Sequence, residues 1–397
     1  FRAGHFSLTF IITAALLTGA CKSSEKFTGF DYDPPDVTNT IDKEVEAQAR
    51  RIIGVGRPRV WVSNEFDGAR LSDFRLQGDS LYRVLIKPEL APINNSPWYA
   101  FKMWTDDSTH IRLQIDYESG EHRYYPKFSY DGIDWDPFPE DLVAEDTACG
   151  CLTIDLELDN DTLYLSAQEM YTYPELQEWL NAQSSLSFLE VDTVGYTHQG
   201  RPLVQMLMDQ TEVGEHSTLV VVSRQHPPEI TGYLASRYFL EEIAGDSELA
   251  ASFRKKFRIL VYPMANPDGA DGGHWRYNAG GVDLNRDWEN FNQPETQSVR
   301  RAITAYAETG GNIIYGIDFH STDENLFYPI LPEIKKPKGD ITYPWIEQII
   351  DGNPDLSIKV EPFDTSSPIF KNWLFKTYAA DALTYEVDDD IDRKKLI

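Results

Sequence analysis

Hydrophobic and polar residues alternate with a period of two between about residues 58 and 167. The alternation is regular through 111–117 and again through 152–159, as expected for strands with one buried and one exposed face. Residues 118–121 contain a glycine among polar residues and predict a hairpin turn into a second strand over 122–130. Several strands without an intervening helix predict an antiparallel β-sandwich.

The pattern changes after about residue 168, where apolar strands alternate with helices. We expect strands over 219–223, 257–263, 313–319 and 382–387, and helices over 174–182, from Pro227 onward, over 295–309 and over 369–379. Such alternation predicts an α/β fold with a mixed, largely parallel sheet flanked by helices. Functional residues in this type of sheet gather at the ends of the strands.

These patterns divide the chain into four segments. They are a leader over 1–21, a polar tether over 22–45, the β-sandwich over 46–167 and the α/β domain over 168–397. Residues 390–397 begin what should be a closing helix, so we expect the natural protein to continue beyond Ile397. We also expect it to begin before Phe1, which is not a methionine.

The leader contains an apolar run, 6–17, between basic residues and Cys21. The run is too short to span a bilayer. It resembles a bacterial lipoprotein signal, which is cleaved before a cysteine that then carries lipid. This resemblance implies a chain anchored through Cys21 to a membrane of the bacterial cell envelope, facing the periplasm or the cell surface. An ordinary signal peptide with an incidental cysteine is the alternative.

Composition and charge exclude one class of partner, the nucleic acids. The 397 residues are 41% hydrophobic and 25% charged, which is typical of globular chains. The net charge of −28 leaves no basic stripe to neutralise phosphates, so nucleic acid is not expected as a partner. Cys149 and Cys151 flank Gly150, and three interpretations stay open for them: a small disulfide ring, two free thiols or part of a metal clip.

A histidine and a glutamate three residues apart follow the expected strand 219–223. His226 and Glu229 lie where this strand passes into a helix, so a nitrogen and a carboxylate oxygen can face one point. Such a pair suits zinc, which needs one more protein ligand and an open position for water. His320 ends a later strand, and Asp318 can support it as a metal-bound histidine. The alternatives are a surface pair and a hydrogen-bonded structural histidine.

Two loops and a late strand add further polar side chains. Arg276 follows the segment 266–269, and Asn285 and Arg286 lie in the loop 281–288. An arginine presents a forked set of donors that matches a carboxylate and can stabilise a developing oxyanion. A solvated loop with a salt bridge is the alternative. Glu386 lies in a β-branched and aromatic strand, where a buried carboxylate needs a partner.

In this order along the chain, the motifs resemble those of the zinc metallocarboxypeptidases. The motifs are His-x-x-Glu at 226–229, Asn-Pro-Asp-Gly at 266–269 with Trp-Arg at 275–276, Val-Asp-x-Asn-Arg-x-Trp at 282–288, a strand ending in His-Ser at 320–321, and Tyr-Glu at 385–386. The resemblance covers about residues 168–397. Segments 62–69, 96–101 and 171–173 are similar to the β-sandwich and its junction in the cytosolic-carboxypeptidase-like branch of this family.

The resemblance implies a peptidase with one zinc ion per chain and a peptide as its substrate. The zinc ligands it implies are His226, Glu229 and His320; Arg276 matches the oxyanion residue, Asn285 and Arg286 match the residues that bind the substrate's C-terminal carboxylate, and Glu386 matches the general base. The implied reaction is hydrolysis of the C-terminal peptide bond by a zinc-activated water. The general base accepts the proton of this water and passes it to the leaving amine.

The chain departs from the family pattern at two positions. Many members have a substrate-binding tyrosine some twenty residues before the general base, where this chain has Asp364. Either the role is absent, or a residue such as Tyr343 or Tyr378 takes it. Pro228 stands where digestive members often have an arginine, so that substrate subsite differs.

The family also places a selective residue at the floor of the pocket for the departing side chain. Counting back fifteen positions from Glu386 leads to Lys371. A partly desolvated lysine at this place attracts a carboxylate and implies a substrate that ends in Glu or Asp. The alternative is a lysine that points to solvent from its helix.

Three functions are open at this point. The first is an exported carboxypeptidase that acts on peptides, with a preference for acidic C-terminal residues. The second is an enzyme that cuts the stem peptide of peptidoglycan. The third belongs to a different class, an inactive relative that binds peptide or glycan; the complete set of ligands, base and arginines favours an enzyme.

Overall fold

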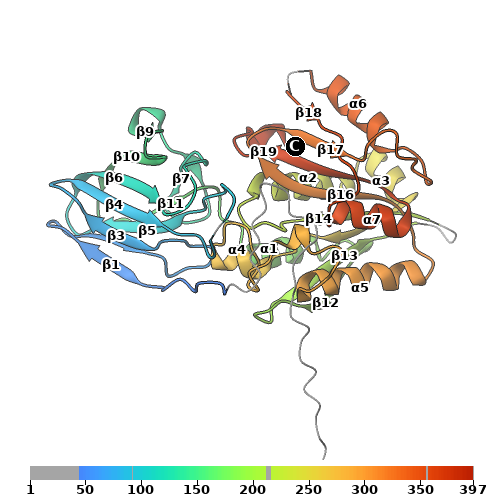
Figure 1. Ribbon diagram of the computed structural model, residues 1–397, viewed down its shortest axis with the longest axis horizontal. Helices are drawn as coiled ribbons and strands as arrows, with labels where there is room; N and C mark the ends of the chain where they lie inside the picture. Colours follow the sequence, from blue (N-terminus) through green and yellow to red (C-terminus); the bar gives the residue numbers. More distant parts are fainter. Residues whose placement is uncertain (1–43, 92, 212–215, 355, 397) are drawn as a thin grey trace, which may run out of the picture.

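The computed structural model describes residues 44–396 except 92, 212–215 and 355. The expected leader, Cys21 and nearly all of the expected tether therefore lie outside the described residues. The chain forms a β-sandwich followed by an α/β unit, which lie side by side in Figure 1. None of the helices in the described part of the chain has the length and hydrophobicity that crossing a membrane requires.

The sandwich consists of two sheets. The first has the strand order β1-β2-β5-β11-β7-β8, with β1 Ile52–Val55, β2 Val60–Ser63, β5 Ala100–Thr105, β11 Leu163–Ser166, β7 Lys127–Ser129 and β8 Asp136–Pro137. The second has the order β3-β4-β6-β10-β9, with β3 Asp73–Leu76, β4 Leu81–Ile86, β6 Thr109–Tyr117, β10 Cys151–Leu158 and β9 Val143–Asp146. Alternate apolar residues of both sheets, such as Phe101, Leu113 and Leu165, are fully buried between them. A disulfide joins Cys149 to Cys151 where β9 passes into β10.

The sandwich differs from the expectation in two respects. β4 and β6 pair in parallel, because the chain crosses to the other sheet as β5 between them. The expected hairpin at 118–121 is wrong, since β6 already has β4 and β10 as neighbours. After residue 121 the chain instead passes to β7 in the other sheet, where a strand forms only over Lys127–Ser129.

The α/β unit has one eight-stranded mixed sheet. Its order is β12-β13-β15-β14-β16-β19-β17-β18, with β12 Leu189–Tyr196, β13 Pro202–Met208, β15 Phe257–Tyr262, β14 Ser217–Ser223, β16 Asn312–Thr322, β19 Asp381–Asp388, β17 Leu326–Pro329 and β18 Lys359–Val360. The four central strands, β15, β14, β16 and β19, run parallel, and antiparallel strands flank them. The expected α/β class with a preceding antiparallel sheet region is therefore confirmed.

Helices cover both faces of this sheet (Figure 1). They are α1 Tyr173–Gln183, α2 Ile230–Ala244, α3 Glu248–Arg254, α4 Pro267–Gly272, α5 Pro294–Glu308, α6 Thr342–Gly352 and α7 Phe370–Tyr378. Successive strand residues contribute to opposite faces: Val221 and Leu383 pack with residues of α1 and α2, whereas Val220 and Ala382 pack with α5 and α7. The near-continuous apolar runs of the parallel strands reflect this burial on both sides.

Two element boundaries near the candidate site and the C-terminal segment differ from the expectation. α2 begins at Ile230 rather than Pro227, because a residue before a proline is disfavoured in the helical region and two prolines follow His226. β16 continues past His320 to Thr322, since β19 pairs alongside it as far as Asp388. Where a closing helix was expected after residue 390, the described residues form one 3₁₀ turn over Arg393–Lys395.

Candidate metal centre

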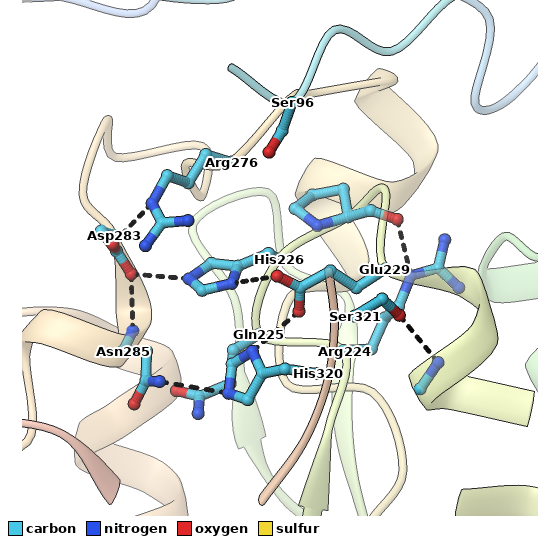
Figure 2. A network of polar contacts seen from close by, with 12 residues as sticks. Ser96, Arg224, Gln225, His226, Glu229, Arg276, Asp283, Asn285, His320 and Ser321 are labelled. Carbon is cyan, nitrogen blue, oxygen red and sulfur yellow. Dashed lines mark hydrogen bonds and ion pairs between the residues drawn. The ribbon is translucent and has the colours of Figure 1, made fainter. Parts of the chain in front are cut away.

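Three buried side chains meet at the carboxyl end of the central strands. His226 follows β14, Glu229 lies at the N-cap position of α2, and His320 lies in β16. His226 Nδ1 lies 2.7 Å from Glu229 Oε1, and His320 Nδ1 lies 2.7 Å from Glu229 Oε2, as Figure 2 shows. One ligand atom of each residue lies within 4.8 Å of the others. The structure thus brings together the three metal ligands implied by the sequence.

The far side of each imidazole is anchored by a carboxylate. His226 Nε2 lies 2.8 Å from Asp283 Oδ1, and His320 Nε2 lies 2.9 Å from Asp318 Oδ2. Metal-binding histidines in proteins almost always have such a partner, which fixes the ring and leaves the other nitrogen free for the metal. Two Nδ1 atoms and one carboxylate, all turned to one point, are the donor set of a catalytic zinc site. The residues present therefore fit zinc.

Charges within this group shift the pKa values of two ligands in opposite directions. Burial opposes ionisation of Glu229, but the imidazoles of His226 and His320 lower its pKa well below the usual value. Burial also opposes protonation of His320, yet the carboxylates of Asp318 and Glu229 raise its pKa well above the usual value. Because a metal binds the neutral imidazole, a metal ion and a proton compete for His320.

Arg224 binds the backbone of the turn that carries His226. This arginine is 2% exposed, has a positive φ of 56°, and donates from Nε to the carbonyl oxygen of Pro227 at 2.7 Å. Asn266 donates from Nδ2 to the carbonyl oxygen of Gln225 at 3.1 Å. α2 then packs close to β16: a Cβ on Gly232 would lie 2.2 Å from the carbonyl oxygen of His320. The backbone around the ligands is therefore closely constrained.

Gln225 links this turn to the support of His320. Its Nε2 donates to both carboxylate oxygens of Asp318 at 2.9 Å, and its Oε1 accepts a hydrogen bond of 2.8 Å from Trp288 Nε1. Neither Gln225 nor Asp283 was assigned a role from sequence. The available signals were weak: Gln225 directly precedes His226, and Asp283 lies within the motif that contains Asn285 and Arg286.

Glu386 lies beside His320 across the sheet, because these two residues are register partners in the parallel pair of β16 and β19. Burial raises the pKa of Glu386 to about 7; His320 opposes this shift, and Glu229 adds to it. A carboxyl group with a pKa near neutrality can both accept and donate a proton at working pH. The pKa of Glu386 thus suits a group that transfers protons.

Two of the polar side chains predicted from sequence, Arg276 and Asn285, lie next to the same ligands or their supports, and Arg286 adjoins Asn285. Arg276 donates from Nε to Asp283 Oδ2 at 2.7 Å, so Asp283 links it to His226. Asn285 Nδ2 lies 3.1 Å from His320 Nε2, and its Oδ1 accepts from the backbone N–H of Phe370. Arg286 donates to the carbonyl oxygen of Asn285. Figure 2 shows Arg276 and Asn285 on the Asp283 side of the two imidazoles.

Lys371 is fully buried in α7, so the solvent-facing alternative is wrong. Its ammonium group donates to the carbonyl oxygens of Tyr328, at 3.0 Å, and Pro329, at 3.4 Å. Burial lowers the pKa of Lys371 to about 7, against the opposing charges of Asp364, Asp318 and Asp381. A buried ammonium with two carbonyl partners keeps a third donor for another group.

The candidates for the substrate-binding tyrosine lie elsewhere. The Tyr343 hydroxyl donates to the carbonyl oxygen of Ile330, and the Tyr378 hydroxyl is bonded to Thr304 Oγ1 in α5. Asp364 is exposed and accepts hydrogen bonds from Ser366. The structure therefore does not bring these three side chains to the metal ligands.

Comparison with known proteins matches residues 176–354 to the family model described as zinc carboxypeptidase. Cytosolic carboxypeptidase 3 of Mus musculus is 31% identical over 179 residues, which are 42% of this chain and 18% of that protein. An uncharacterized protein of Zymomonas mobilis is 24% identical over 358 residues, 84% of this chain and 90% of that protein. The match thus spans under one-fifth of the length of the mouse protein.

Solved structures of similar fold include a metallo-carboxypeptidase from Burkholderia cenocepacia. It superposes with a TM-score of 0.71 at 21% identity, and the match covers 83% of this chain and 89% of that one. A metallo-carboxypeptidase from Pseudomonas aeruginosa superposes with a TM-score of 0.66 at 20% identity, over 84% of this chain and 95% of that one. Each match covers more of this chain than the α/β unit contains. The shared fold therefore includes residues of the β-sandwich.

Proposed function

Because the chain carries a zinc carboxypeptidase domain, homologous to the cytosolic carboxypeptidases, we propose that it removes C-terminal residues from peptides by hydrolysis. The observation that carries this proposal is the buried group of His226, Glu229 and His320 with Glu386 beside it in the sheet. A binding module would not need a proton-transfer group with a pKa of about 7 next to a complete set of metal ligands.

Each residue of the site has a separate task in this reaction. His226, Glu229 and His320 would hold the zinc ion, which would act as a Lewis acid and lower the pKa of a bound water molecule. Glu386 accepts a proton from the attacking water at its carboxylate and delivers it to the nitrogen of the leaving amine. The peptide bond breaks, and the products are a free amino acid and a shortened peptide.

Donors on the other side of the site bind the substrate. The Arg276 guanidinium lies next to Asp283 and donates to the oxygen on which negative charge develops. Arg286 and Asn285 bind the terminal carboxylate, for which the planar, forked donors of arginine are well suited. Requiring this carboxylate confines cleavage to the last peptide bond.

The experiment that tests the proposal is an assay of the purified, zinc-loaded protein against a C-terminally varied peptide library and purified muropeptides. Mass spectrometry should detect loss of one C-terminal residue from library peptides. Cleavage of the muropeptides alone would replace the proposal with a peptidoglycan stem-peptide hydrolase. Binding of peptide or glycan without cleavage would assign the chain to the class of inactive binding modules.

We further propose that Lys371 selects substrates that end in Glu or Asp. The support is its complete burial and the third N–H of its ammonium group, which neither carbonyl oxygen occupies; the Phe363 ring lies 5.7 Å from the same nitrogen. Thr384 lies two residues before Glu386 on the same strand, and among the described residues its buried Oγ1 has no hydrogen-bond partner. These groups offer polar contacts to an acidic side chain.

The substitution Lys371→Ala should therefore reduce the ratio of kcat/KM for peptides ending in Glu over those ending in Leu by about 10-fold or more, as for a lost charged hydrogen bond. In the wild type, this ratio should fall as pH rises through about 7, because the lysine then loses its charge. Lys376→Ala, on the exposed side of the same helix, is the control. A wild-type preference for Leu or Lys, or an unchanged ratio in Lys371→Ala, would exclude Lys371 as the selective residue.

We also propose that the mature chain is exported and begins at a lipidated Cys21, which lies outside the described residues. The substitution Cys21→Ser should leave the leader uncleaved or release the protein from the membrane fraction, since the thiol that accepts lipid is gone. Fractionation and mass spectrometry of the N-terminal peptide provide the measurement. A processed wild-type protein that is soluble and carries no lipid would favour an ordinary signal peptide.

A further inference from the structure

The backbone loop that carries Arg276 is held by a glutamate of the β-sandwich. Glu89 lies in the segment after β4 and is completely buried. Its Oε2 accepts a hydrogen bond from the backbone N–H of Trp275 at 2.7 Å, and its Oε1 accepts from the N–H groups of Arg276 at 3.0 Å and Tyr277 at 2.8 Å. One carboxylate thus binds three consecutive amides. We propose that Glu89 is a positioning residue for Arg276, so that the sandwich orients a residue of the active site.

A second sandwich residue, Arg70, binds a backbone carbonyl group of the same loop. Arg70 is 3% exposed and donates from Nε to the carbonyl oxygen of Gly273 at 2.7 Å. Its Nη2 lies 4.0 Å from Glu89 Oε2, so the two form a buried ion pair. Gly273 has a φ of 62°, and a Cβ there would lie 2.4 Å from the carbonyl oxygen of Ala69. The sandwich backbone therefore approaches the loop as closely as a glycine permits.

These contacts determine where the guanidinium of Arg276 lies. Glu89 holds the backbone of this residue, and Asp283 holds its side chain through Nε. Because Asp283 also binds His226, the loop is aligned with the metal ligands only while both anchors are present. Stabilisation of a developing charge requires donors that are already in place, and a displacement of about 1 Å can cost about 100-fold in rate.

The energetic cost of burying the Glu89 carboxylate favours a role in orienting the loop. A buried carboxylate is costly unless hydrogen bonds satisfy it, and hydrogen bonds from backbone amides to a charged acceptor are among the strong ones. An apolar contact between the sandwich and the loop would join the two parts of the chain without this cost. Such a contact would not determine the orientation of three successive peptide groups, whereas the carboxylate of Glu89 does.

The test compares Glu89→Gln with wild type and with Arg276→Ala, and it rests on the proposed function because it uses peptide hydrolysis. The neutral glutamine keeps the size of the side chain but has one acceptor oxygen in place of two. We expect kcat to fall about 10- to 100-fold, with KM and zinc content nearly unchanged. In the double variant, Glu89→Gln should add no further loss to Arg276→Ala, because both act on the same group.

A matched control is Glu118→Gln, which removes a carboxylate from a partly exposed ion pair with Lys87 in the same sandwich. Its kcat should equal that of the wild type. If Glu89→Gln does not fold, Glu89→Asp retains the charge but shortens the side chain, and it should show the same loss of kcat. An unchanged kcat in a folded Glu89 variant, or fully additive losses in the double variant, would contradict the positioning role. Glu89 would then have a structural role only.

Hydrogen exchange separates this inference from the proposed function, because it needs no substrate. The amides of Trp275, Arg276 and Tyr277 should exchange slowly in wild type and at least about 10-fold faster in Glu89→Gln, since they lose the charged acceptor. Glu118→Gln should leave them slow. Equal exchange in all three proteins would overturn the positioning role. A wild type without peptidase activity but with this exchange pattern would instead overturn only the proposed function.

Discussion

Replacing Glu386 by glutamine should nearly abolish peptide hydrolysis while leaving the fold and the zinc content intact. The carboxylate lies beside His320 in the register of β16 and β19, and burial raises its pKa to about 7. An amide cannot accept a proton from water, so the loss should be about 10²–10⁴-fold, and larger because the same group also protonates the leaving amine. Steady-state kinetics of both proteins with one good peptide substrate provide the measurement.

The matched control for this change is Glu324→Gln. Glu324 is partly exposed and forms an ion pair with Lys359, so its loss should alter neither kcat nor KM appreciably. Circular dichroism and zinc analysis should be the same for all three proteins. Near-normal turnover in Glu386→Gln would mean that another group serves as the base.

Replacing His320 by alanine should have the second large effect, the loss of bound zinc together with activity. Wild type should contain one zinc ion per chain, because two imidazoles and one carboxylate form a three-ligand site with an open fourth position. Removal of one of only three protein ligands leaves a site too weak to retain the metal through dialysis. Elemental analysis after dialysis against a weak chelator measures the occupancy directly.

An exposed histidine of the sandwich, His110, provides the control for this experiment. His110→Ala should retain one zinc ion and full activity. Full zinc occupancy in His320→Ala would show that His320 is not a zinc ligand. Treatment of wild type with a strong chelator should abolish hydrolysis, and added zinc should restore it.

The parts of the site that sequence could predict are those attached to strand ends. His226 follows β14, and His320 and Glu386 lie in β16 and β19. Because parallel strands end at the same edge of a sheet, three motifs far apart in the chain had to converge. The element boundaries near them were harder to predict: two prolines delay α2 until Ile230, and β19 prolongs β16 to Thr322.

The contacts that sequence could not predict depend on how separate parts of the fold pack. Glu89 lies 186 residues before Trp275 in the chain and belongs to no motif, yet it accepts three hydrogen bonds from the Arg276 loop. Gln225 likewise joins Asp318 to Trp288 through a single buried amide. The turn at 118–121 has the composition of a hairpin, but occupied neighbours on both sides of β6 send the chain to the other sheet. Local patterns contain no information about such neighbours.

The central claim is that the site recognises and removes a C-terminal residue, and a pair of peptides differing only at the terminus tests it most directly. Zinc-loaded protein should release the last amino acid from a peptide with a free carboxylate, with products identified by mass spectrometry. The same peptide with an amidated terminus should be cleaved at least about 100-fold more slowly, because Arg286 and Asn285, which we propose to bind the terminal carboxylate, then lack their anionic partner. Equal cleavage of both peptides, or cleavage at internal bonds, would contradict this account.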